Sequence, residues 1–513
     1  MTKKLTRALL AFALVGGLSA CNKENVNGTP EVVPSTGNTY MSVAVSTTLP
    51  ADPLKAEDTS HNPMGDYAGR DKINDLTVYV VSVSDGKVEK KEFTNLSPIV
   101  GQANVYRTTA WKVDAGKKEV YVLVNLNGTP IKTALDNAAA IGKTAFETAY
   151  ADSYDMTDAS GVLGTYAKLD GGKDIIGMNG KTAAQVEVKG GVDQATAEAG
   201  TKNCAKINVR RLVAQAVVTK DAANDLTIKG TRNGATVTIA TLSDLKWDVM
   251  QFEKKTYLDP MTSENGQEAT KVKYCKTPSF EFIPASLNAF TTDAAGKYFY
   301  RAMTGIALGD FTRNASNPDN VTSIVGNTMK FITETTHQYG GKPVAEGGVA
   351  PETGYRKGNT AYAIISAQIT PSNDTWATGQ ETGYAAGSDL FYGLNDGKFY
   401  KDKAAAKAAN LNNDKNVLTY KGGLCYYVTW LNPNEVAKPL TSPVLRNNIY
   451  HVNIKAFKKV GYTGNPLTPG TENPKDPNDN TPDPSELLSV SETYMAVEAT
   501  VVNWGVHSVD LEL

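Results

Sequence analysis

The segment LTVYVVSV, residues 76–83, indicates which fold class to expect. This segment and EVYVLVNL, residues 119–126, are rich in the β-branched and aromatic residues that favour pleated sheets. Similar runs recur along the chain, with turn-rich spacers between them: residues 207–218, 235–242, 280–285, 360–369, 424–431 and 448–457. Long helices do not alternate with these strands, so the pattern argues against a parallel α/β sheet and predicts an all-β fold.

Two stretches have helical patterns instead, residues 133–151 and, more briefly, residues 401–411. We interpret both as short helical insertions between strands. The net charge of −2 and the absence of a basic block predict no nucleic-acid partner.

The N-terminal residues predict export. Lys3, Lys4 and Arg7 precede an apolar run over residues 8–20 that is too short to span a bilayer as a helix. The run ends in Leu-Ser-Ala-Cys, which is typical of a bacterial lipobox with cleavage between Ala20 and Cys21 and lipidation of Cys21. The alternative is an ordinary signal peptide with a cysteine nearby.

The length of 513 residues predicts two or three domains, because single cores rarely exceed about 250–300 residues. After a signal peptide over residues 1–20 and a propeptide over 21–55, we expect two antiparallel β-sandwich domains with insertions. A polar segment near Asp221 to Asp225 divides them, which gives units 56–221 and 222–460.

A proline-rich segment follows the second unit. Residues 461–492 contain six prolines between positions 466 and 484 and almost no apolar residues, so we expect a solvated, extended linker. The linker leads to a strand-like ending, TYMAVEATVVNWGVHSVDLEL, over residues 493–513. A single tethered strand needs a sheet to join.

The ending repeats a stretch near the other end of the chain. TYMSV at residues 39–43 and TYMAV at residues 493–497 differ at one position, and their alternation continues beyond the five residues. Strand side chains alternate between faces, so each copy presents similar side chains to one face. In the predicted first strand, Met41, Val43 and Val45 lie on one face and Tyr40 lies on the other. The predicted last strand uses Tyr494, Met495, Val497, Ala499, Val501 and Trp504. Two unrelated edge strands are the alternative.

The basic residues around the first copy suggest a route for its removal. Residues 24–54 contain no Lys or Arg, and Lys55 is the first basic residue after the strand, in a polar segment of the kind that proteases cut. A cut between Lys55 and Ala56 would detach the lipid anchor together with the first strand. Arg70 is the alternative site.

Other chemistry is sparse. Cys204, Cys275 and Cys425 could form one disulfide or none, and no Cys/His spacing suggests a metal site. The four histidines are scattered, and no complete catalytic motif occurs. We therefore expect no enzyme activity, no cofactor and no metal.

Several segments resemble the fimbrillins of Bacteroidota, the subunits of type V pili, and most closely the shaft subunits of Porphyromonas minor fimbriae. The matching stretches, besides the lipobox and the proline-rich segment, are YAGRDKINDLTVYVV, VRRLVAQAVV, RKGNTAYAIISAQI, YYVTWLNP, SPVLRNNIYHVNIKAFKKVGYTGNPLTP and the ending TYMAVEATVVNWGVHSVDLEL. The block at residues 446–450 and the ending are the most specific.

The resemblance implies two transthyretin-like β-sandwich domains and a mechanism of assembly. The precursor would be a lipid-anchored (palmitate-bearing) outer-membrane lipoprotein, and a trypsin-like protease would remove its first strand. The last strand of another copy would then fill the vacated place, which builds a head-to-tail filament. The family's usual cut follows an arginine, so Lys55 departs from the pattern and keeps Arg70 open.

The resemblance also implies a setting at the cell surface. Accessory anchor and tip subunits would join the filament, and host or bacterial receptors would bind it in adhesion, biofilm formation and virulence. A lipid-anchored tip adhesin or sugar-binding protein, whose ending completes its own sandwich, is the runner-up, and a surface enzyme comes third. Whether the TYM half or the SVDLEL half of the ending acts as the donor stays open.

Overall fold

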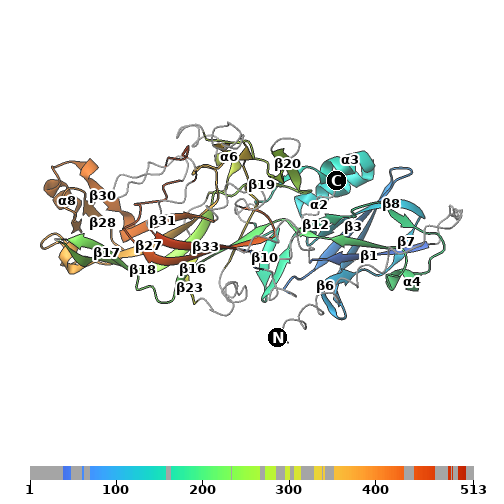
Figure 1. Ribbon diagram of the computed structural model, residues 1–513, viewed down its shortest axis with the longest axis horizontal. Coiled ribbons are helices and arrows are strands. Elements are labelled where there is room, and N and C mark those ends of the chain that lie inside the picture. Colours follow the sequence, from blue (N-terminus) through green and yellow to red (C-terminus); the bar gives the residue numbers. More distant parts are fainter. Residues whose placement is uncertain are drawn as a thin grey trace, which may run out of the picture.

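The computed structural model describes residues 39–47, 61–62, 70–157, 163–232, 234–265, 272–284, 295–300, 305–312, 329–337, 339–340, 352–431, 444–467, 483–486, 488 and 495–503. These residues form an elongated molecule with two β-sheet lobes along its long axis (Figure 1). Strands predominate and the helices are few and short, so the predicted all-β class is confirmed.

The N-terminal lobe contains two sheets. The first sheet has the strand order β14-β1-β6-β5, with β7 also paired to β1. Its strands are β1 (Thr39–Ser46), β5 (Pro98–Ile99), β6 (Gln102–Arg107), β7 (Trp111–Val113) and β14 (Cys204–Asn208). The second sheet has the order β15-β12-β8-β3-β4, with β13 also paired to β8. Its strands are β3 (Asp75–Ser82), β4 (Val88–Thr94), β8 (Gly116–Val124), β12 (Met178–Lys181), β13 (Val186–Val188) and β15 (Arg210–Arg211).

The C-terminal lobe also contains two large sheets. The third sheet has the order β2-β33-β32-β16-β23, with β24 also paired to β16. Its strands are β2 (His61–Asn62), β16 (Ala214–Asp221), β23 (Gly309–Phe311), β24 (Lys330–Ile332), β32 (Asn448–Phe457) and β33 (Met495–Asn503). The fourth sheet has the order β17-β18-β27-β31, with β22 also paired to β18. Its strands are β17 (Thr227–Arg232), β18 (Ala235–Met250), β22 (Ile306–Ala307), β27 (Tyr362–Pro371) and β31 (Leu424–Trp430).

The described residues also form smaller sheets of two or three strands. They comprise β9 (Ser153–Asp155) with β19 (Lys255–Tyr257), β10 (Ala167–Asp170) with β11 (Lys173–Ile176), β20 (Met261–Asn265) with β21 (Val272–Lys276), β25 (Tyr339–Gly340) with β26 (Glu352–Thr353), and β28 (Leu390–Gly393) with β29 (Phe399–Tyr400) and β30 (Val417–Tyr420). β9 lies in the chain between β8 and β12 of the second sheet, and β19 follows β18 of the fourth sheet, so the β9–β19 pair connects the two lobes.

The described helices are short. They are α2 (Pro130–Ile141), α3 (Lys143–Tyr150), α4 (Gln194–Glu198), α6 (Ala295–Lys297) and α8 (Lys403–Ala409), with 3-10 turns at Asn373–Thr375, Asp414–Asn416 and Lys421–Gly423. Both predicted helical insertions are confirmed. The longer one is broken in two at Gly142, whose φ of 132° suits a residue without a Cβ.

Most predicted strands occur where the sequence places them, and two details differ. Residues 280–285 were predicted as a strand, but their described part, up to residue 284, forms turns in which Phe280 and Phe282 donate to the carbonyls of Thr277 and Ser279. The sheets are mixed rather than wholly antiparallel, because β1–β14, β16–β32, β16–β23 and β2–β33 are parallel pairs. Such pairs need long connections, which the pattern of a single strand does not reveal.

The change of lobe occurs earlier than predicted. β15 pairs with β12 in the second sheet, whereas β16 pairs with β32 in the third. A boundary between residues 221 and 222 would therefore assign β16 to the wrong lobe, and the pairing places the change at Leu212 and Val213. Residues 207–218 form one β-prone run that alternates only loosely, and no turn residue marks this passage in the sequence.

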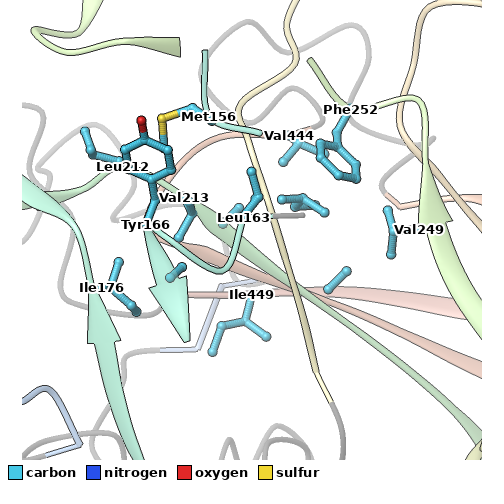
Figure 2. Packing of buried hydrophobic residues seen from close by; sticks show 14 of the residues in the cluster. Met156, Leu163, Tyr166, Ile176, Leu212, Val213, Val249, Phe252, Val444 and Ile449 are labelled. Carbon is cyan, nitrogen blue, oxygen red and sulfur yellow. The ribbon is translucent and has the colours of Figure 1, made fainter. Parts of the chain in front are cut away.

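The two lobes share a continuous apolar core where they meet (Figure 2). Figure 2 shows Leu212 and Val213 in this core together with side chains from both lobes, and all of the labelled residues are buried. The labelled residues are Met156, Leu163, Tyr166, Ile176, Leu212, Val213, Val249, Phe252, Val444 and Ile449. Close packing of this kind resists relative motion of the two lobes.

Candidate strand-exchange sites

β1 is an interior strand of the first sheet. Along one edge it runs parallel to β14, from Ser42 opposite Cys204 to Ser46 opposite Asn208. Along the other edge it is antiparallel to β7 at its start and to β6 at its end. We call the place that β1 fills the acceptor groove: the space bordered by β14, β6 and β7.

The predicted inward face of β1 is the buried one. Met41, Val43 and Val45 have exposed fractions of 0% and belong to the main hydrophobic core. Tyr40 lies on the other face, half-buried against Ala110, Val192 and Ala197. Removing β1 would therefore expose apolar core surface and leave unpaired backbone groups on both sides of the groove.

Polar contacts fix the start of β1 in place. The side-chain amide of Asn203 donates to Thr39 Oγ1 at 3.1 Å and to the carbonyl of Tyr40 at 3.0 Å. The Ser42 hydroxyl donates to the carbonyl of Ala197 at 2.6 Å, which ties the strand to α4. Sequence reasoning missed Asn203 and α4, because the residues they contact lie about 150 positions away in the chain and no local motif marks such a pairing.

β33 lies in the other lobe, on the third sheet. It is antiparallel to β32 over its whole length, from Met495 opposite Phe457 to Asn503 opposite Asn448. The structure therefore shows the ending paired with its own C-terminal lobe.

The register of this pair follows the apolar pattern of the ending. The positions of Met495, Val497, Ala499 and Val501 lie opposite Phe457, Ile454, Val452 and Tyr450, in that order. All four β32 residues belong to the main core. A bulge at Lys455 skips one residue of β32 and keeps this match in phase. Four of the predicted donor residues thus occupy positions opposite core residues of β32.

On the side away from β32, β33 pairs with a short parallel strand. His61 and Asn62 of β2 pair with Val501 and Val502. Sequence reasoning also missed this contact, since two residues form too short a run to signal a strand.

The proline-rich segment is less solvated than predicted where it is described. Leu467 and Leu488 are 0% and 5% exposed and pack in one cluster with Tyr462 on the C-terminal lobe. The Lys357 backbone N–H donates to the carbonyl of Glu486 at 3.0 Å, and the Leu488 N–H donates to that of Tyr355 at 3.2 Å. Leu467 and Leu488 thus anchor the described parts of the segment to the C-terminal lobe.

Of the two predicted cleavage sites, Arg70 lies in described structure. Its guanidinium is 3.7 Å from a carboxylate oxygen of Asp174, and its carbonyl accepts the Asp174 N–H at 2.9 Å. The next residue, Asp71, pairs with Arg211 in a nearly dry environment. A protease needs an extended, accessible segment, so these contacts protect the Arg70 bond.

The remaining predicted residues lie outside the described ones: Ala20, Cys21, Lys55, Ala56, Tyr494 and Trp504. Cys204, Cys275 and Cys425 are free thiols, and Cys425 is fully buried, which raises its pKa to about 11. In the described parts of the chain, no group of acidic, His or Cys side chains could hold a metal ion, and no helix is long and apolar enough to cross a membrane.

A buried polar network lies in the C-terminal lobe next to the lobe junction. Arg446 forms an ion pair with Glu334 at 2.6 Å and donates to Thr256 Oγ1 at 2.9 Å. Nearby, burial raises the pKa of the Glu253 carboxyl to about 8, although hydrogen bonds from Thr277 and from the Ser279 N–H favour its charged form. Both oxygens of the Glu253 side chain accept hydrogen bonds.

Comparison with known proteins decides the family. Two proteins named Minor fimbrium subunit Mfa1, from Porphyromonas gingivalis, are each 36% identical over 540 aligned residues, which cover 99% of this chain and all of each relative. The chain belongs to the fimbrillin family. Residues 418–510, which contain β31, β32 and β33, match the family described as Major fimbrial subunit protein type IV, Fimbrillin, C-terminal.

Solved fimbrial structures are more distant from this fimbrillin. A fimbrilin (fimA) from Porphyromonas gingivalis W83 aligns with 91% of this chain and 98% of its own at 13% identity and a TM-score of 0.38. The tip fimbrial protein Mfa3 from Porphyromonas gingivalis aligns with 91% of this chain and all of its own at 11% identity and a TM-score of 0.34. The assignment rests on the sequence relationship alone.

Proposed function

We propose that this fimbrillin is the shaft subunit of a cell-surface fimbria and polymerises by strand exchange. The precursor is exported, lipidated on Cys21 after cleavage at Ala20, and held in the outer membrane. A trypsin-like protease removes the segment that carries β1. The β33 segment of a second copy then enters the acceptor groove, and repetition builds a head-to-tail filament.

One observation carries this proposal: the first described strand is an interior strand with three fully buried core side chains. An interior strand at the start of a chain can be cut away, and its loss leaves a groove that only a similar strand can fill. The segment at residues 493–500 is similar to β1: Thr, Tyr, Met and Val occupy the same four positions in both. The neighbours of the two strands agree as well, because β1 and β33 each run parallel to one neighbour and antiparallel to the other.

The contacts of Arg70 support a cut nearer to Lys55. A cut between Thr47 and His61 separates β1 from the rest of the chain without disturbing the Asp71–Arg211 pair. A cut after Arg70 would place a new charged terminus beside that buried pair. This would be unfavourable, because it would bury another charge.

The fimbrial family is one of structural subunits, and we propose that this chain has no catalytic role, cofactor or metal. Its partners are other copies of itself, accessory anchor and tip subunits, and receptors on host or bacterial surfaces. Adhesion and biofilm formation follow from the filament.

Polymerisation of purified protein tests the proposal. The unlipidated precursor is digested with a Lys-specific protease, and ladders that resist SDS but not heat are expected on gels. The same digestion of a chain that ends at Glu492 should give no ladder. Ladders from the shortened chain would rule out the C-terminal strand as the donor. A Lys55→Ala variant that matures normally would place the cut elsewhere, first at Arg70.

The full-length pairing of β33 with β32 favours one second candidate, a tip adhesin whose ending completes its own lobe. Such a protein would stay monomeric after the cut, with or without residues 493–513. The digestion experiment therefore separates the two candidates.

A further inference from the structure

One residue of the C-terminal strand carries a charge where β1 carries none. When TYMAVEAT (residues 493–500) is aligned with TYMSVAVS (Thr39–Ser46), Glu498 takes the position of Ala44. Ala44 is 5% exposed. A carboxylate at a position this well covered would be costly without a cationic partner.

The neighbours of Ala44 supply that partner. Ala44 lies directly opposite Arg107 on β6 and opposite Lys206 on β14. Residues directly opposite each other in a sheet share a face, so a side chain at the Ala44 position stands between two cations.

Arg107 has unused hydrogen-bonding capacity. One terminal nitrogen of its guanidinium donates to the carbonyls of Glu198 and Ala199, at 3.3 and 2.9 Å. Its Nε is buried and has no hydrogen-bond partner among the described residues. A buried donor without a partner is destabilising, and a nearby carboxylate would satisfy it as well as the charge.

We propose that Glu498 of one copy pairs with Arg107 of the next copy, beside Lys206, and that this pair sets the register of the exchanged strand. The inference rests on the strand exchange proposed above and specifies its geometry. In this register Met495 takes the place of Met41 and Val497 the place of Val43.

Other registers place the charge badly. A slip of two residues in one direction moves Glu498 to the position of Ser42, which is fully buried and whose hydroxyl is bonded to the carbonyl of Ala197 beneath α4. A slip of two in the other direction moves it to the position of Ser46, opposite Val105 and Asn208. A slip of one residue turns the whole apolar stripe away from the core. Among the registers within two residues of the proposed one, only the proposed one joins the charge to a cation.

The home position of Glu498 has a different partner directly opposite it. On the third sheet its register partner is Asn453, whose side-chain amide donates to Asp221 at 2.8 Å. Lys455, two residues along β32, lies 3.2 Å from the same Asp221 carboxylate. The acceptor groove thus presents a cation directly opposite Glu498, whereas β32 presents an amide there.

A binding assay limited to one interface tests the pair. The donor is the uncut precursor, whose own groove stays filled by β1, and the acceptor is the cut chain ending at Glu492. Glu498→Lys on the donor should weaken binding about tenfold or more, because it removes the ion pair and places like charges opposite each other. Arg107→Glu on the acceptor should weaken binding equally, for the same reason. The Glu498→Lys donor combined with an Arg107→Glu, Lys206→Glu acceptor should bind within about threefold of the wild-type pair.

Two further variants serve as controls. Lys112→Glu on the acceptor lies on the same face, opposite Tyr40, and should change binding less than about twofold, since surface charges away from specific partners have small effects. Glu498→Gln on the donor leaves the acceptor untouched and should remove most of the salt dependence of binding.

The outcomes are distinguishable. Wild-type affinity for the Glu498→Lys donor, or unchanged salt dependence for Glu498→Gln, would overturn the inference while leaving strand exchange intact. Failure of the wild-type donor to bind the cut acceptor would overturn strand exchange itself, and the inference with it.

Discussion

Removal of β1 without replacement should destabilise the N-terminal lobe severely. Met41, Val43 and Val45 are fully buried, and burying a side chain of this size stabilises a protein by about 1.5–3 kcal/mol. The three together account for about 4.5–9 kcal/mol. Whole domains are stable by only about 5–15 kcal/mol, so the empty lobe should be close to unfolding.

Thermal unfolding of a chain that ends at Glu492 measures this effect, because the shortened chain has no donor strand. The cut chain, freed of its β1 fragment, should melt about 10–35 °C below the uncut chain, at roughly 2–4 °C per kcal/mol for a unit of this size. Trp111 gives a local probe. It lies opposite Met41 and is 8% exposed, so its fluorescence should shift to longer wavelengths when β1 leaves.

A nicked sample that still holds its β1 fragment is the matched control and should melt close to the uncut chain. Equal melting temperatures for the nicked sample and the emptied sample would refute the reasoning, because they would show that β1 contributes little to the lobe. Full-length cut protein should regain the lost stability as filaments form.

Three more predictions concern other features of the fold. Asp71→Ala removes the carboxylate that pairs with the buried Arg211 and should lower the free energy of unfolding of the precursor by about 3–5 kcal/mol in urea titrations. Lys72→Ala, which breaks the exposed ion pair with Asp170, should cost less than about 1 kcal/mol. The folded-state pKa of Glu253, about 8, lies above the unfolded value of 4.5, so its stabilising contribution is complete below pH 4.5 and is lost as the pH rises through 8. Glu253→Gln should flatten the fall in melting temperature between pH 4.5 and 8, and an unchanged fall would assign it to other groups. Cys204 borders the acceptor groove opposite Ser42, so a thiol reagent should label it faster after β1 is removed and slowly again in filaments. The buried Cys425 should stay unlabelled in all three states. Equal labelling of Cys204 in the precursor, the emptied chain and the filament would contradict the placement of the groove.

The sequence predicts those parts of the structure that depend on local pattern. Residues 448–457 coincide with β32, and the alternation in TYMSVAVS identifies Met41, Val43 and Val45 as the core-facing side chains. Strand period and β-branched composition are local properties, so they can be read without knowing the partner strand.

The parts that depend on long-range pairing could not be predicted. The passage between lobes at Leu212 and Val213 is set by the strands that β15 and β16 join. The position of Arg107 opposite Ala44 follows from a register between strands far apart in the chain. The proline-rich segment looked solvated because its composition is polar, yet Leu467 and Leu488 are enough to anchor it. Partner choice and register need the assembled sheet.

A cross-link within the filament tests the central claim, that the C-terminal strand of one copy occupies the acceptor groove of the next. In the proposed register Ala496 takes the place of Ser42, directly opposite the native Cys204 on β14. Neighbouring strands lie about 4.8 Å apart, and a disulfide spans Cα separations of roughly 4.4–6.8 Å. In its home sheet Ala496 pairs instead with Ala456 in the other lobe.

Filaments of the Ala496→Cys variant should therefore form disulfide-linked ladders that survive boiling in SDS without reductant. The ladders should disappear when Cys204→Ser is added, and Val497→Cys, one residue along and on the opposite face, should give none. Filaments that assemble normally from Ala496→Cys subunits yet form no bond to Cys204 under oxidising conditions would contradict the account, because the donor strand would then lie elsewhere.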